Sequence, residues 1–269
     1  MKLPNLIAVR YAAPLKEGGS LPAIVETAED GLFVVKFLGA GQGAKALVAE
    51  IIVGELARRI GLPVPDLALI DVDASFGRTE RDPEIRDLLK ASTGVNVGLR
   101  FMEGALNYDP VAAADLVDPT FAADLVWLDS FVTNIDRTAR NPNLMVHENV
   151  LVLIDHGAAL YFHHAWSNVT EKSARTPFAP IANHVLLPKA ASIEEADARI
   201  MERVTPAVLT EVLGMVPDSL LLHTPLGVER PFEVAEDARQ AYVNTLIQRL
   251  SERAFVTTAE TARLALATP

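Results

Sequence analysis

Three side chains between residues 136 and 155 have the types and the spacing that phosphoryl transfer requires. Asp136 and Asn141 lie five residues apart in a stretch that contains Pro142, so we expect them on a loop. Asp155 follows the apolar run NVLVLI and precedes Gly157 by two residues. Phosphoryl transfer uses one carboxylate to orient or deprotonate the attacking hydroxyl, and an amide oxygen with a second carboxylate to hold Mg²⁺ against the nucleotide phosphates.

The order of these residues is more informative than any one of them. The apolar runs LMVH and NVLVLI predict a small hairpin, which would return Asp155 to the neighbourhood of Asn141. Each residue alone is an ordinary turn former. We interpret Asn134, Asn143 and Asn149 in the same stretch as turn residues. The stretch as a whole favours a site for a hydroxyl acceptor and a Mg²⁺-bound nucleotide.

Two residues upstream would complete such a site. Lys36 stands among apolar residues in FVVKFL, which we predict to be a strand. Glu50 lies on the helix that the apolar spacing predicts for residues 44–60. A lysine that holds phosphates and a glutamate that fixes this lysine are the expected pair. The alternatives are a lysine that extends its stem to solvent and a glutamate on a solvated helix face.

Two short stretches are candidates for contacts with ATP. The first is a turn whose backbone amides could approach phosphates, although a hairpin turn without a function explains it nearly as well. The second falls where a hinge would meet the adenine. The candidate residues are Gly18, Gly19, Ser20, Phe101, Met102, Glu103 and Gly104.

The order of predicted elements indicates an α+β fold with two lobes. Strand patterns dominate residues 1–105, interrupted by the strong helix at 44–60. Residues 106–269 are mostly helical, apart from the hairpin, and the last helix is predicted over 233–255. We therefore expect a strand-rich, nucleotide-binding N-terminal lobe and a mostly helical C-terminal lobe that carries the catalytic loop and the metal site.

Composition excludes several classes of function. A formal net charge of −11 argues against a nucleic-acid-binding surface, which needs clustered Lys and Arg. The chain has no cysteine, which excludes disulfides, thiolate nucleophiles and cysteine zinc sites. The N-terminus does not have the pattern of a signal peptide, and no apolar run approaches the roughly 20 residues of a membrane helix. We expect a cytoplasmic protein without a nucleic-acid or membrane partner.

The sequence resembles the HipA-like kinases, distant relatives of protein kinases and phosphoinositide kinases, and most of all their shorter single-chain bacterial members. The matching segments are VVK at 34–36, AEIIVGELARRIGLPVP at 49–65, NIDRTARNPN at 134–143 and LIDHG at 153–157. The resemblance implies a two-lobed protein-kinase-like fold that uses ATP and Mg²⁺. It also implies that Asp136 is the catalytic base, that Asn141 and Asp155 bind Mg²⁺, and that Lys36 and Glu50 form the phosphate-binding pair.

The sequence departs from full-length HipA, and it also lacks one mark of an ordinary kinase activation loop. No comparable extra N-terminal region and no antitoxin-contacting surface can be matched, so toxin activity and a DNA-binding partner are not implied. No Ala-Pro-Glu sequence follows Gly157, so residues 158–188 cannot be mapped as an ordinary activation loop.

By the resemblance the acceptor is a protein Ser or Thr hydroxyl, favoured over a small molecule. The sequence leaves the acceptor and the oligomeric state open.

Two other functions compete with a kinase. GAGQGA at 39–44 lies between a predicted strand and a predicted helix, with Asp66 or Asp71 at a plausible distance for a ribose, and could belong to a dinucleotide-binding oxidoreductase. That fold would continue with alternating strands and helices, whereas this chain becomes helical after residue 105. A pseudokinase that binds nucleotide or a partner without transfer is the other alternative. The presence of all the catalytic residue types weighs against it.

Overall fold

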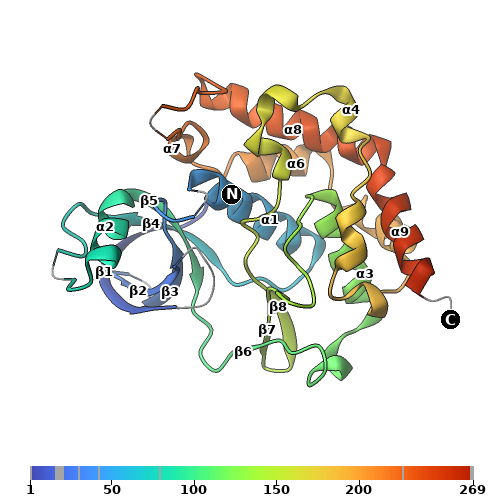
Figure 1. Cartoon of the computed structure of the whole chain (residues 1–269), viewed down its shortest axis with the longest axis horizontal. Helices are drawn as coiled ribbons and strands as arrows, with labels where there is room; N and C mark the ends of the chain where they lie inside the picture. The colour runs from blue at the N-terminus through green and yellow to red at the C-terminus, as the bar shows by residue number, and fades with distance from the viewer. Residues whose placement is uncertain are drawn as a thin grey trace.

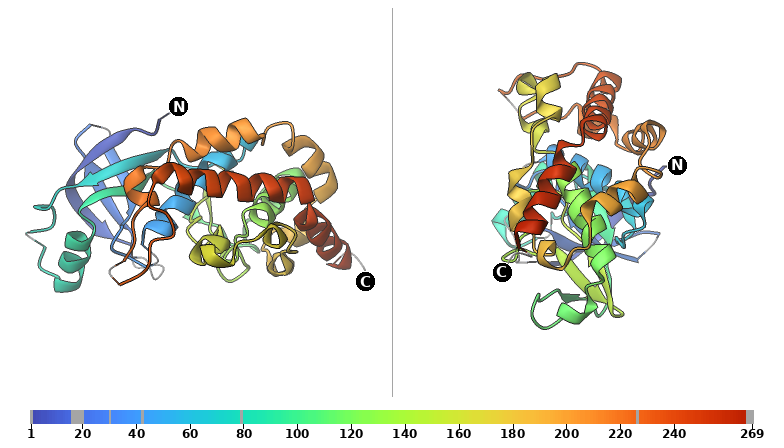
Figure 2. Two further views of the ribbon diagram at one scale, coloured as in Figure 1. Left: turned by 90° about the horizontal axis from the view of Figure 1, so that it is seen from above. Right: turned by 90° about the vertical axis from the view of Figure 1, so that its right-hand side faces the viewer.

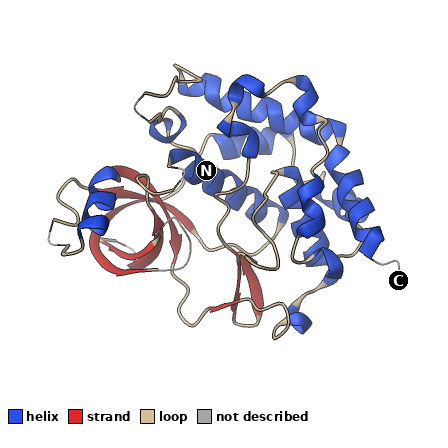
Figure 3. Cartoon of the chain, viewed as in Figure 1, coloured by secondary structure: helices blue, strands red, loops and turns tan. Residues whose placement is uncertain are grey.

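A computed structural model describes residues 2–15, 21–29, 31–41, 43–78, 80–225 and 227–266. Strands gather in the N-terminal part and helices in the C-terminal part (Figure 1 and Figure 3). Viewed from above, the strands lie at one end of the molecule and the helices extend away from them (Figure 2). The mixed α+β class is confirmed, whereas a division of the chain into lobes 1–105 and 106–269 stays a prediction.

The N-terminal strands close into a five-stranded barrel in the order β1-β2-β3-β5-β4. The strands are β1 (Asn5–Pro14), β2 (Ala23–Thr27), β3 (Gly31–Lys36), β4 (Leu67–Val72) and β5 (Gly94–Arg100). Only β1 and β4 pair in parallel, and the other four pairs are antiparallel. Val25, Phe33 and Ile70 fill the interior, and α2 (Pro83–Ala91) adds Leu89 to the same core.

This barrel contradicts the dinucleotide-binding alternative. A dinucleotide fold places its glycine-rich turn at the edge of an open and mostly parallel sheet. Here the described part of the segment 39–44 connects β3 to α1 (Ala44–Ile60), and β3 pairs antiparallel with both of its neighbours. The physical setting for the phosphate-binding turn of an oxidoreductase is therefore missing from the described strands.

Helix α1 lies between the barrel and the C-terminal helices (Figure 1). It packs against β5, α6 (Pro206–Leu213) and α7 (Asp218–Leu221). Most of its residues are buried, on more than one face, and the left-handed Gly61 (φ 93°) ends it. The sequence predicted these bounds correctly, but it did not predict that the position of Glu50 would be fully buried.

The C-terminal part is built around α3 (Pro119–Phe131). Asp118 caps this helix by accepting hydrogen bonds from the amides of residues 120 and 121. Trp127 and Phe131 form an aromatic cluster with Phe255. Besides α6 and α7, this part contains the helices α4 (Glu171–Ala174), α5 (Ile193–Ile200), α8 (Ala235–Glu252) and α9 (Ala254–Leu266). Among the helices described here, none is both long and apolar enough to cross a membrane.

The remaining elements are short. The predicted hairpin is confirmed as β7 (Leu144–His147) and β8 (Val150–Leu153), to which β6 (Leu106–Asn107) adds a third strand. The 3-10 helices are η1 (Ala114–Leu116), η2 (Tyr161–His164), η3 (Trp166–Asn168), η4 (Ala179–Asn183) and η5 (Leu187–Lys189). The helix predicted for 233–255 is confirmed as α8, but it is not the last one, because Arg253 adopts a left-handed conformation (φ 53°) that ends α8 and α9 follows it.

Arg249 on α8 closes the end of α3 that leads into the Asp136 loop. Its guanidinium donates to the carbonyl of Phe131 at 2.9 Å and to that of Ser130 at 3.0 Å, and it lies 5.5 Å from the ring centre of Phe255. The last carbonyls of a helix have no partner within the helix. Burial lowers the pKa of Arg249 to about 10, so the side chain remains charged at neutral pH.

Replacing Arg249 by Met removes its donors from the buried carbonyls of Phe131 and Ser130, and the carbonyl of Ser130 keeps only the amide of Thr133 at 3.4 Å. We expect R249M to lower the free energy of unfolding by about 2 kcal/mol or more, measured by urea denaturation. The control is R175M, which removes an exposed ion pair with Glu252 and costs about 1 kcal/mol at most. Equal losses in the two variants would contradict a role for Arg249 in closing α3.

Candidate active site

Lys36 at the end of β3 binds two carboxylates that come from distant parts of the chain. Its ammonium nitrogen lies 2.7 Å from Glu50 Oε2 on α1 and 2.6 Å from Asp155 Oδ1 after β8. The lysine side chain is 11% exposed and that of Glu50 is fully buried. Lys36 therefore does not extend into solvent and Glu50 does not lie on a solvated face. The structure brings together three of the five residues that the sequence singled out for chemistry.

The charges of this cluster stabilise one another. Burial by itself lowers the pKa of Lys36, but the negative charges of Glu50 and Asp155 outweigh burial, so the pKa is raised. The ammonium of Lys36 in turn lowers the pKa of Asp155, against the opposing effect of burial. At neutral pH the cluster therefore contains a protonated lysine and an ionised Asp155.

The turn after β8 is attached to α1 by its backbone. Asp155 has a left-handed conformation (φ 55°), which a non-glycine residue adopts at a cost. The amide of His156 donates to Glu50 Oε2 at 2.8 Å, so Glu50 binds Lys36 and this turn with the same oxygen. A Cβ on Gly157 would lie 3.3 Å from Cβ of Ala46, which explains the glycine at this close approach to α1.

The loop after α3 holds Asp136 by amide groups on either side. The backbone amide of Asp136 donates to Asn134 Oδ1 at 3.1 Å. Its carboxylate oxygen Oδ2 accepts from Asn141 Nδ2 at 2.8 Å and from Asn143 Nδ2 at 3.4 Å. Asp136 is partly exposed and Asn141 is exposed. The structure therefore places the other two candidates, Asp136 and Asn141, in direct contact.

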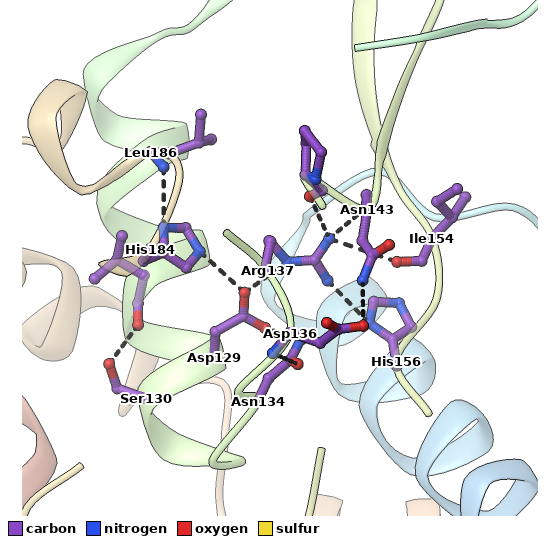
Figure 4. A network of polar contacts seen from close by, with 12 residues as sticks. Asp129, Ser130, Asn134, Asp136, Arg137, Asn143, Ile154, His156, His184 and Leu186 are labelled. Carbon is purple, nitrogen blue, oxygen red and sulfur yellow. Dashed lines mark hydrogen bonds and ion pairs between the residues drawn. The ribbon is translucent and has the colours of Figure 1, made fainter. Parts of the chain in front are cut away.

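Arg137 joins the loop to the turn that carries Asp155 (Figure 4). Its guanidinium donates to the carbonyl of Asn143, to that of Ile154 at 3.5 Å, and contacts His156 Nδ1 at 3.3 Å. The amide of Ile154 also donates to the carbonyl of Asn143 at 3.1 Å. The two ends of the hairpin are thus neighbours, as predicted, and Asn143 lies against Ile154, the residue before Asp155.

Sequence reasoning missed several residues of this network. Asn134 and Asn143 were interpreted as turn residues only, whereas both contact Asp136. The spacing of Asn134, two residues before Asp136, is a signal of an Asx turn that could have identified it. Asp129 was not singled out, although a charged residue inside the apolar run LVWLDSFV is unusual. Its carboxylate lies 2.6 Å from Arg137 Nε.

The candidate ATP-binding stretches receive little support from the structure. Gly18, Gly19 and Ser20 lie outside the described residues. The second stretch, 101–104, lies on the connection between β5 and β6, where the chain passes from the barrel to the helical part (Figure 1). The amide of Phe101 donates to the carbonyl of Leu32 at 3.0 Å, and Gly104 has a positive φ of 77°. Contacts of either stretch with a nucleotide remain predictions.

The two candidate metal ligands offer hard oxygen atoms. Asn141 donates its amide nitrogen to Asp136, so its side-chain oxygen is the atom that a metal would bind. Asp155 directs Oδ1 to Lys36, and its side chain is 44% exposed. No group of three or more His, Asp or Glu residues that could hold a metal occurs in the described part of the chain. The donor set fits Mg²⁺, which needs few protein oxygens when phosphates and water supply the others.

The chain matches the family model described as HipA-like kinase over residues 9–256. It belongs to the HipA-like kinase family. Family membership and fold together support a kinase-type phosphotransferase.

The fold is also similar to a solved kinase structure, that of the Helicobacter pylori proinflammatory kinase CtkA. The two chains share 14% sequence identity with a TM-score of 0.56, and the match covers 99% of this chain and 100% of that chain. At this identity the likeness concerns the fold. A comparison with curated proteins finds no match.

Replacing Lys36 by Met leaves the buried carboxylate of Glu50 without its cation. We expect K36M to lower the free energy of unfolding by about 3 kcal/mol or more at pH 7. The control K45M removes a lysine of α1 that is only partly buried, and should cost about 1 kcal/mol at most.

The decrease in the free energy of unfolding caused by K36M should also depend on pH. Because Lys36 lowers the pKa of Asp155, the pair stabilises the fold above the unfolded pKa of about 4 and loses this stabilisation as the pH falls further. Urea denaturation at pH 7 and pH 3.5 should therefore show a smaller difference between wild type and K36M at the lower pH. A difference that grows in acid would contradict the charge pairing.

Proposed function

We propose that this protein is an ATP- and Mg²⁺-dependent kinase that transfers the terminal phosphoryl group of ATP to a hydroxyl, with a protein Ser or Thr as the favoured acceptor. The observation that carries the proposal is the contact of Lys36 with both Glu50 and Asp155, in a member of the HipA-like kinase family. A lysine held by a helix glutamate beside a metal-binding aspartate is the arrangement that kinases use to bind nucleotide phosphates.

In this proposal the nucleotide lies at the cluster of Lys36. The ammonium of Lys36 contacts the phosphates, and Glu50 keeps it directed towards them. Asn141 and Asp155 hold Mg²⁺ through their oxygens. Bound Mg·ATP supplies the transferable phosphoryl group and the cationic charge that neutralises the phosphate oxygens. The adenine lies near 101–104, and the backbone amides of 18–20 approach the phosphates.

Asp136 receives or orients the acceptor hydroxyl. Asn141 and Asn143 donate to Oδ2, and we assign Oδ1 to the hydroxyl proton of the acceptor. Hydrogen bonds from two amides fix the orientation of the carboxylate, and a proton acceptor must be held within hydrogen-bond reach of the hydroxyl. As Asp136 accepts the proton of the hydroxyl, the electron pair of the O–H bond stays on the oxygen and makes it a better nucleophile towards phosphorus.

A protein Ser or Thr is favoured on the resemblance to HipA-like kinases. A small-molecule hydroxyl is the competing acceptor, and a pseudokinase that binds ATP without transfer is the competing function. These possibilities differ in one measurable property, which is where the label from [γ-³²P]ATP is found. Kinase activity places it on a protein or a small molecule, whereas a pseudokinase leaves it on ATP.

Replacing Asp136 by Asn removes the proton acceptor and keeps the shape of the side chain. We expect D136N to slow Mg²⁺-dependent transfer of label from [γ-³²P]ATP by about 100-fold or more, with nucleotide binding retained. The control D87N changes an exposed aspartate on α2 and should leave the rate unchanged. Equal rates in wild type and D136N would contradict the role of Asp136. A wild type that binds Mg·ATP without any transfer would indicate a pseudokinase.

Replacing Asp155 by Ala removes a proposed metal ligand but leaves Lys36 paired with Glu50. We expect D155A to stay folded and to lose the Mg²⁺-dependent rise in melting temperature that ATP produces in the wild type. NAD should produce no rise in either protein. An ATP-induced rise in D155A equal to that of the wild type would contradict the metal assignment.

A further inference from the structure

Asp129 is a fully buried carboxylate that lies beneath the loop of Asp136. It belongs to the last turns of α3 and has no exposed surface. Its Oδ1 accepts from Asn134 Nδ2 at 3.0 Å, and its Oδ2 accepts from Arg137 Nε at 2.6 Å and from His184 Nε2 at 3.0 Å (Figure 4). A buried charge is costly unless such partners compensate it. A residue with this cost needs a reason to be retained.

The partners of Asp129 hold the loop on both sides of Asp136. Asn134 turns its other side-chain atom, Oδ1, towards the backbone amide of Asp136. Arg137, the residue after Asp136, extends from Asp129 to the carbonyl of Asn143 and to His156. Asp129 therefore fixes Asn134 and Arg137 directly, and Asp136 lies between these two residues in the sequence.

His184 completes this arrangement from a different segment. The amide of Leu186 donates to His184 Nδ1 at 3.1 Å, so the proton of the neutral ring lies on Nε2 and points to Asp129. Burial lowers the pKa of His184 despite the neighbouring Asp129 carboxylate, which favours this neutral form. Burial alone would raise the pKa of Asp129, but Arg137 and His184 outweigh it and the pKa is lowered.

The backbone around His184 also pairs with the loop. Thr138 and His184 form an isolated antiparallel bridge, and the amide of Val185 donates to the carbonyl of Arg137 at 3.2 Å. The segment 158–188, which could not be mapped from sequence, therefore returns to the loop at this point. Its end contacts the loop through backbone atoms and contacts Asp129 through one side chain.

We propose that Asp129 and His184 are positioning residues that set the geometry of the Asp136 loop. Neither residue touches the reacting groups, and both act through Asn134, Arg137 and the backbone of the loop. The proposal rests on the proposed function in so far as Asp136 is the group that acts in transfer. A purely structural role makes a different prediction, because it would lower stability without changing the turnover of the folded enzyme.

Two substitutions of His184 separate its two hydrogen bonds. In H184Q the amide nitrogen can still donate to Asp129, as Nε2 does, but the acceptor for Leu186 is lost. In H184N the carbonyl oxygen can still accept from Leu186, as Nδ1 does, but the donor to Asp129 is lost. Each variant loses one hydrogen bond, so similar losses of stability are expected. Only H184N should disturb the loop through Asp129.

The turnover of Mg·ATP in the full chain tests the proposal. We expect H184N to lower kcat by about 10-fold or more with KM for ATP changed by about 3-fold at most, because misplacement of a catalytic group affects the chemical step. H184Q should keep kcat within about 3-fold of the wild type. Equal effects of the two variants on kcat would overturn the proposal.

A second buried aspartate, Asp197, provides a matched control for Asp129. Asp197 is 5% exposed, accepts a hydrogen bond from Trp127 Nε1 at 2.8 Å and pairs with Arg253 at 3.2 Å, away from the loop. D129N and D197N should both lower the melting temperature. Only D129N should lower kcat in the folded protein, assayed well below its melting temperature. Loss of kcat in proportion to the loss of stability in both variants would overturn the proposal.

Amide hydrogen exchange tests the loop without relying on activity. The amides of Asp136, Thr138, Asn141 and Ile154 have hydrogen-bond partners within the network. We expect their exchange to accelerate by about 10-fold or more in H184N and not in H184Q. If the wild type shows no turnover, the proposed function fails, and exchange alone then decides the positioning claim. Unchanged exchange in H184N would overturn it.

Discussion

The ion pair between Lys36 and Glu50, extended to Asp155, is the interaction on which the rest of the structure depends. It joins the end of a barrel strand, the middle of α1 and the turn after β8, which are separated by 14 and 119 residues along the chain. An isolated charge could not be buried at this position. The barrel, α1 and the hairpin must therefore be assembled together before all three charges are compensated.

A second buried ionic centre lies beneath the first and is linked to it by one residue. Asp129 and Arg137 form this centre under the loop of Asp136. His156 contacts Arg137 with its ring at 3.3 Å and donates its backbone amide to Glu50 at 2.8 Å. Burial lowers the pKa of His156 to about 4, so a neutral ring lies beside the arginine cation. Through these two contacts, His156 fixes the positions of α1, the Asp136 loop and the turn of Asp155 relative to one another.

The chemistry of this site was easier to predict from sequence than its surroundings. Lys36, Glu50 and Asp155 could be selected because phosphoryl transfer needs these residue types in this order, and the structure brings them into contact. The helix at 44–60 could be predicted from its apolar spacing and Gly61. The break at Arg253 could not, because a left-handed arginine has no local signal and depends on tertiary packing.

The contacts of Asp129 illustrate why the rest of the site was not predictable. Asn134 and Arg137 are five and eight residues away, but His184 is 55 residues away and belongs to a segment without regular periodicity. The position of His184 depends on how the 3-10 turns and loops of this segment pack, and sequence periodicity does not predict such packing. The same holds for Asn143, whose side chain and carbonyl face two parts of the network at once.

The most direct measurement is a crystal structure of the protein with a non-hydrolysable ATP analogue and Mn²⁺, located by its anomalous scattering. The account predicts a metal ion bound by Asp155 and Asn141, phosphates in contact with Lys36, and Asp136 facing the terminal phosphate. A nucleotide bound away from Lys36, or a metal ion that contacts neither Asp155 nor Asn141, would contradict the account.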